Sequence, residues 1–281
     1  GVTPNPGALL APNDNLFCGS CHASTWSGPS YPGLPHFTGS AHGGSLTMVW
    51  PGPLPPPRIE PDAAGKCLNC HDPHGWVDAA GFVPFLGLAR EEALCLACHD
   101  GAPAANVRSD FQKPFRHPSP DYSGRHTGMG EALATDFGRS PTNRRHAECE
   151  DCHNPHVARS DGAIAPGAGE ASKRVLGVSR VAVVHGAAGS APVFTFIPGS
   201  DTLSTPGGES QLCYKCHSSW TTQPAGQTDL ARVLNPNNPS FHPVEALGRN
   251  TNIAFGAFVT PWGPLSRTRC GDCHGSDDEL A

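Results

Sequence analysis

The twelve cysteines of this 281-residue chain all lie in one repeated pentapeptide, Cys-x-x-Cys-His. Two thiols at this spacing can add to the two vinyl groups of one porphyrin, and the histidine that follows can bind its iron axially. The pattern is typical of c-type haem attachment. Numbered as motifs one to six in chain order, the copies are Cys18, Cys21 and His22; Cys67, Cys70 and His71; Cys95, Cys98 and His99; Cys149, Cys152 and His153; Cys213, Cys216 and His217; and Cys270, Cys273 and His274.

Other uses of paired cysteines fit this pattern less well. Zinc ribbons, thioredoxin-like redox pairs and disulfide frameworks also contain Cys-x-x-Cys. None of them requires a histidine after the second cysteine, and zinc bound by four cysteines at a time would leave the motif histidines without a role. We therefore expect six haem c groups, each with one motif histidine as its proximal iron ligand.

Distal ligands can come from the histidines outside the motifs. Because Met48 and Met129 are the only methionines, methionine can serve two haems at most, and bis-histidine iron is favoured. The histidines outside the motifs are His36, His42, His74, His117, His126, His146, His156, His185 and His242.

An internal repeat narrows this choice. The segment from Cys67 reads CLNCHDPHG, LCLACHD and FRHPSP, and the segment from Cys149 reads CEDCHNPH, LCYKCHS and FHPVE. Each copy has a histidine three residues after its first motif histidine and a later His-Pro pair. The second copy is 36 residues longer between its two motifs, and this insert contains two apolar runs, 175–184 and 193–197, that predict a β-hairpin.

The repeat and the local sequence select six distal ligands. A histidine three residues beyond a proximal ligand is pinned to the near face of its own haem, so we expect it to reach a neighbouring haem. Proline after a histidine holds the backbone extended, and glycine permits close approach to a ring. We expect the distal ligands to be His42, His74, His117, His146, His156 and His242. His36, His126 and His185 remain, and His126 is the strongest alternative.

Composition indicates what surrounds these groups. The chain has 33 glycines and 30 prolines, while hydrophobic residues make up only 37%. We expect mostly irregular coil, short helices around some motifs and one small β-hairpin, wrapped around an elongated stack of six covalently bound haems that replaces a conventional core. Three segments follow: 1–58 with motif one and a proline-rich connector, 59–145 with the first doubled repeat, and 146–281 with the rest.

Charge and hydropathy exclude several classes of protein. The net charge of −6 leaves no basic stripe for nucleic acid. No apolar stretch is long enough to span a membrane. The chain begins at Gly1 without a charged and apolar leader, as expected of a mature form after removal of a signal peptide.

The paired motifs CLNCHDPHG…LCLACHD and CEDCHNPH…LCYKCHS resemble the doubled-CXXCH family of multihaem c-type cytochromes over about residues 67–243. The haem number and the scarcity of regular structure are similar to the hexahaem extracellular cytochromes of metal-reducing bacteria that form conductive filaments. This resemblance implies an extracellular or cell-surface homopolymer that exchanges electrons with other multihaem cytochromes, metal oxides or electrodes. It also implies that a neighbouring subunit can supply a distal histidine, here His36 or His42.

Two classes of function remain open. Electron transfer, in a filament or a discrete periplasmic or surface carrier, requires six irons that each have two ligands. A multihaem reductase requires one iron with an open position. Enzymes of the family often mark that haem with lysine in place of the motif histidine, and all six motifs here end in histidine. We therefore expect an electron-transfer protein without a catalytic residue.

Overall fold

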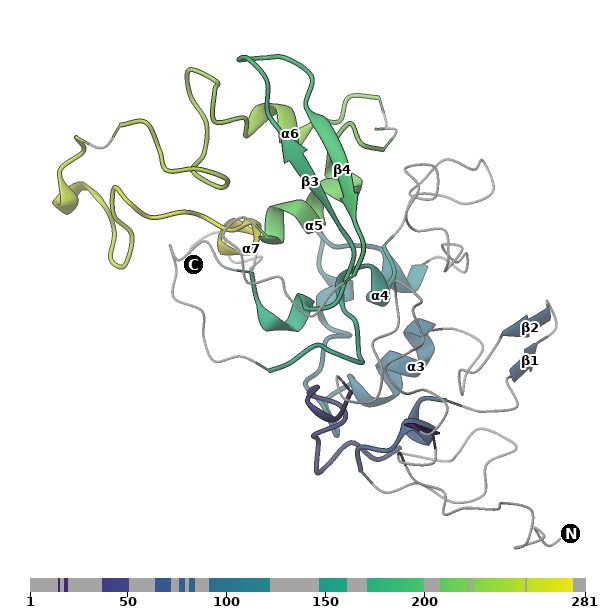
Figure 1. The fold of residues 1–281 in the computed structure, drawn as a ribbon. Coiled ribbons are helices and arrows are strands. Elements are labelled where there is room, and N and C mark those ends of the chain that lie inside the picture. Colours follow the sequence, from purple (N-terminus) through teal and green to yellow (C-terminus); the bar gives the residue numbers. More distant parts are fainter. Residues whose placement is uncertain are drawn as a thin grey trace, which may run out of the picture. The chain divides into compact units, whose positions relative to one another are not determined.

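The structure is a computed structural model of residues 1–281, and it describes 15, 18–19, 37–50, 64–71, 76–78, 81–83, 91–121, 147–160, 171–199, 208–221, 223, 225–250 and 252–274. The elements are short and the connections between them are long (Figure 1). The described α-helices are α3 (Glu91–Cys98), α4 (Cys149–Cys152), α5 (Gly208–His217), α6 (Leu230–Val233) and α7 (Cys270–Cys273). Single 3-10 turns are η1 (Cys67–Asn69), η2 (Asp110–Gln112), η3 (Ser119–Asp121), η4 (Lys173–Val175) and η5 (Phe255–Ala257).

Each of motifs two to six lies on a turn of helix, which confirms the expectation of short helices at the motifs. Motif two forms η1, motifs three and five end α3 and α5, and motifs four and six form α4 and α7. In motifs two, three, four and six the histidine N–H donates to the carbonyl of the first cysteine, at 2.9–3.0 Å. This hydrogen bond closes one α-helical turn. The two cysteines, three residues apart, therefore lie on the same face of the turn.

Polar side chains inside the motifs hold these turns. Asp151 and Asp272, each placed before a second cysteine, accept from the backbone N–H of Glu148 and Arg269 at 2.8 Å. Asn69 occupies the same position in motif two, where its side-chain amide donates to the Met48 carbonyl at 3.2 Å. These hydrogen bonds satisfy groups that a helix only one turn long would otherwise leave without partners.

The hairpin expected from the insert is present. Strands β3 (Arg180–Val184) and β4 (Val193–Ile197) pair antiparallel, from Arg180 opposite Ile197 to Val184 opposite Val193. The first strand begins later than the apolar run that starts at residue 175, because 173–175 form η4 and Gly177 has a φ of 80°. Strand β3 packs on α5 (Figure 1) and buries Val181 completely.

A second antiparallel pair, β1 (Trp76–Asp78) with β2 (Gly81–Val83), was not predicted from the sequence. Each strand has three residues, and the segment lacks the long β-branched run that marks the insert. The described chain is thus mostly coil with short helices and the insert hairpin, as expected, and it has the β1–β2 pair in addition.

The chain forms two compact units. The first contains residues 1–108 and 155–157, and the second contains 109–154 and 158–281. Each buries few apolar side chains among its described residues: Met48, Leu94, Leu96 and Val157 in the first, and Ala171, Leu176, Val178, Val181, Leu212, Tyr214, Ala231 and Val244 in the second. The three sequence segments proposed above remain a prediction. No helix in the described ranges is long and apolar enough to cross a membrane.

The packing of β3 on α5 can be tested with two valines of one strand. Val181→Ala removes fully buried methyl groups, and we expect it to lower the free energy of unfolding by about 1–3 kcal/mol. Val184 is 64% exposed, so Val184→Ala is expected to change it by less than about 0.5 kcal/mol. Guanidinium unfolding of the haem-loaded protein, followed by far-UV circular dichroism, measures both. Equal effects of the two substitutions would contradict this packing.

Candidate functional site

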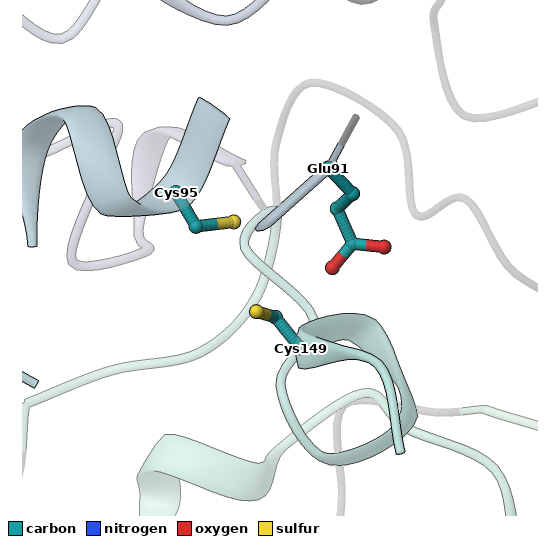
Figure 2. A group of neighbouring side chains, drawn as sticks. All are labelled: Glu91, Cys95 and Cys149. Carbon is teal, nitrogen blue, oxygen red and sulfur yellow. The ribbon is translucent and has the colours of Figure 1, made fainter. Parts of the chain in front are cut away.

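The cysteine thiols project from the helical turns as separate side chains. Figure 2 shows Cys95 projecting from α3, which begins at Glu91. It also shows Cys149, the first residue of α4. None of the described cysteines is in a disulfide, so the expected attachment thiols within the described ranges are not consumed by cross-links.

Burial keeps several thiols in their protonated form. It raises the pKa of Cys152 to about 12 and also raises that of Cys98. The pKa of Cys67 rises to about 11 through burial and the adjacent Cys18 thiol. A redox-active pair requires the opposite, a lowered thiol pKa in a positive environment. The raised pKa values of these three thiols therefore do not fit thioredoxin-like chemistry.

Cys213 of motif five and Cys270 of motif six are neighbours in the second unit. The Cys213 thiol donates a hydrogen bond to Cys270, which raises the pKa of Cys213 and lowers that of Cys270. Helices α5 and α7 pack together at this point, and the Glu209 carboxylate at the beginning of α5 accepts from Gly271 N–H at 2.6 Å. Motifs five and six therefore present their first thiols at one place.

In the first unit, two motif histidines face histidines from elsewhere in the chain. His71 of motif two and His156 have ring centroids 5.8 Å apart, with ring planes 17° from parallel. His99 of motif three and His42 have centroids 6.0 Å apart, with nearly perpendicular rings. Each pair joins an expected proximal ligand to an expected distal one.

The electrostatic environment keeps His156 neutral. Burial lowers the pKa of His156 to about 4, and the nearby His71 and His42 rings add to this effect. An imidazole must be neutral to offer a lone pair to a metal. His156 is thus prepared to act as a ligand at neutral pH.

Backbone carbonyls orient two further imidazoles. His42 Nδ1 lies 3.2 Å from the Pro155 carbonyl, and His153 Nδ1 lies 3.0 Å from the Arg174 carbonyl. A carbonyl only accepts, so Nδ1 carries the proton in both hydrogen bonds and Nε2 keeps its lone pair. Metal-bound histidines usually donate their other ring N–H in this way.

The second unit contains one further histidine pair. His217 of motif five and His117 have ring centroids 6.1 Å apart. His242, another expected distal ligand, is exposed, and Thr268 N–H donates to the carbonyl of the following Pro243 at 2.9 Å. Among the described residues, His153, His242 and His274 have no aromatic ring partner. Other expected positions lie outside the described residues: Cys21, His22, His74 and His146, with the alternatives His36 and His126.

Gly43, which follows His42, lies in close contact with the backbone of Phe37. A Cβ on Gly43 would overlap the Phe37 carbonyl oxygen, so only glycine fits this turn. The expectation that glycines here permit close approach to a haem ring is a different matter and stays a prediction.

One polar cluster, around Glu245, and one buried lysine were not predicted from the sequence. His185, treated as surplus, bonds through Nε2 to Glu245 at 2.7 Å, and the Tyr214 hydroxyl donates to the other oxygen of that carboxylate. Burial and Glu245 raise the pKa of Tyr214. The buried lysine is Lys215, and comparison of the two repeats could have identified it, because motif three has Ala97 at the matching position.

The donor set and its surroundings fit haem c. Paired thiols share one face of a turn, and three imidazoles from elsewhere in the chain face motif histidines. Leu46 and Phe115, near His42 and His117 in sequence, are 92% and 87% exposed, and a large apolar macrocycle would cover such side chains.

Comparison with known proteins identifies the same motif. The family described as "Doubled CXXCH motif" matches residues 60–104, which contain motifs two and three. No curated protein and no solved structure shows a significant match. The family match supports a multihaem c-type cytochrome that binds haem iron and takes part in electron transfer.

Covalent attachment can be tested at motif four. The double variant Cys149→Ala, Cys152→Ala lacks both thiols of one pair, so we expect it to carry one haem fewer than the unaltered chain. Intact mass spectrometry under denaturing conditions counts only covalently bound groups. An unchanged mass difference between the holoprotein and its polypeptide would show that motif four does not attach haem.

Proposed function

We propose that this protein is a hexahaem c-type cytochrome that conducts electrons by hopping between bis-histidine haems. The supporting observation is the set of three histidine pairs, with ring centroids 5.8–6.1 Å apart. An imidazole nitrogen binds a transition metal at about 2 Å, so two rings on opposite sides of one ion have centroids about 6 Å apart. All three pairs match this span, and each contains one motif histidine.

These pairs suggest which distal histidine serves which motif. We assign His156 to the haem of motif two, His42 to that of motif three and His117 to that of motif five. His74, His146 and His242 are assigned to the remaining three haems, whose proximal ligands are His22, His153 and His274. His156 follows the motif-four histidine by three residues, so its assignment agrees with the expectation that such a histidine reaches a different haem.

The protein groups would hold, orient and insulate the redox centres. When bound, haem iron supplies one-electron redox chemistry. Two imidazoles would hold each iron, and the Nδ1 hydrogen bonds of His42 and His153 would fix the orientation of their rings. An iron held by two imidazoles would leave no coordination position for a substrate, and this favours electron transfer over a reductase.

We further propose that the protein acts outside the cell as a homopolymer that passes electrons to other multihaem cytochromes, metal oxides or electrodes. The motif pattern that resembles filament-forming cytochromes supports this proposal. A feature of the hairpin supports self-association: Val184 and Val193, paired at one end of β3 and β4, are 64% and 65% exposed. Exposed apolar strand ends favour pairing with another chain.

Replacing His156 tests the assigned ligation. We expect His156→Ala to retain the full haem content, because the cysteines are unchanged, and to convert one haem from low-spin to high-spin or to a new ligand set. Electron paramagnetic resonance and magnetic circular dichroism record this change. His185→Ala is the control, since His185 bonds to Glu245, and all haems should stay low-spin. A fully low-spin, unaltered spectrum for His156→Ala would refute the assignment.

The polymer proposal has a separate test. Replacing Val184 and Val193 with aspartate places like charges side by side at the hairpin end, so we expect shorter filaments or discrete particles in electron micrographs. Leu265→Asp is the control, because Leu265 is also exposed but lies outside the hairpin. Wild-type protein that sediments only as a monomer at high concentration would contradict the polymer.

A further inference from the structure

The second copy of the repeat contains a buried lysine where the first copy has alanine. Lys215 lies between Cys213 and Cys216 of motif five, and Ala97 lies between Cys95 and Cys98 of motif three. The lysine is only 2% exposed. A buried cation requires partners that compensate its lost hydration.

Those partners connect motif five to motif four. Lys215 Nζ donates to the Asp151 carbonyl at 2.8 Å and to Ser179 Oγ at 3.3 Å. Asp151 lies between Cys149 and Cys152 on α4, so the amine of one haem-binding turn bonds to the backbone of another.

We propose that Lys215 is a fixed positive charge that raises the reduction potentials of the haems attached at motifs four and five. This inference rests on the proposed function. An electron that arrives at iron lowers the positive charge there, so a nearby cation stabilises the reduced form. Within a protein this interaction is screened less than in water, and nearby charge is one of the means by which proteins tune haem.

Two buried acidic groups, Asp151 on α4 and Glu148 directly before it, do not reverse this direction. Asp151 and Glu148 are buried, and Asp151 accepts from the Glu148 N–H at 2.8 Å. Their negative charge favours the oxidised form. Lys215 offsets that effect, and its removal would leave the carboxylates to lower both potentials.

The two repeats would then differ in function. Ala97 in motif three carries no charge, so Lys215 would give the haems of the second repeat a stabilisation of the reduced form that the first repeat lacks at this position. Such a difference gives the haem series a direction along which electrons prefer to move.

The test compares haem-loaded variants by spectroelectrochemical titration, with the haem content of each fixed by mass spectrometry. Lys215→Met removes the charge at similar length, and we expect two of the one-electron steps to move to lower potential. Lys215→Arg keeps the charge, and Ser179→Ala keeps the lysine, so both should titrate like the wild type. Ser179→Asp places a carboxylate beside the amine and should lower the same two steps without deleting Lys215.

Each possible result either supports the inference about Lys215 or overturns it. A Lys215→Met curve that overlays the wild type, or an equal shift in Lys215→Arg, overturns the inference. If Lys215→Met fails to load haem, Ser179→Asp decides, and unchanged steps there overturn it. Wild-type protein without low-spin haem c would instead refute the proposed function. If only the inference fails, the wild type has low-spin haem, and its reduction potentials do not depend on residue 215.

Discussion

One helical turn closed by a hydrogen bond is the unit on which this structure depends. In motifs two, three, four and six, the N–H of the histidine reaches the carbonyl of the first cysteine. That bond places the two thiols on one face of the turn and fixes the position of the histidine backbone from which the ring projects. Because the turn is so short, it needs side chains such as Asp151 and Asp272 for its remaining polar groups. Irregular chain can then connect these turns without losing their local geometry.

The second constraint is the placement of a second imidazole. The segment 155–157 belongs to the first compact unit although its neighbours in sequence belong to the second. Through it, His156 faces His71, and the Pro155 carbonyl orients His42, which faces His99. Two neighbouring residues thus influence two different motif histidines. On the proposed function, this segment couples the ligation of two haems.

The sequence predicted which groups take part in the chemistry better than it predicted how those groups are arranged in space. The spacing of the motifs indicated haem attachment, and the two apolar runs of the insert indicated the hairpin, because each is a local property of a few residues. Spacing could not indicate that His117 would face His217 or that Lys215 would reach Asp151, because these pairs join distant parts of the chain. The β1–β2 pair escaped prediction for a different reason: three-residue strands carry too little pattern. Comparison of the two repeats could nevertheless have drawn attention to Lys215, because the matching position of the first repeat is Ala97.

Bis-histidine ligation can be observed by high-resolution electron cryomicroscopy of the purified haem-loaded protein, which identifies both axial ligands of every iron. We expect each of three irons to be bound by one histidine pair: His156 with His71, His42 with His99, and His117 with His217. Water, methionine or a different histidine in any of these distal positions would contradict this expectation.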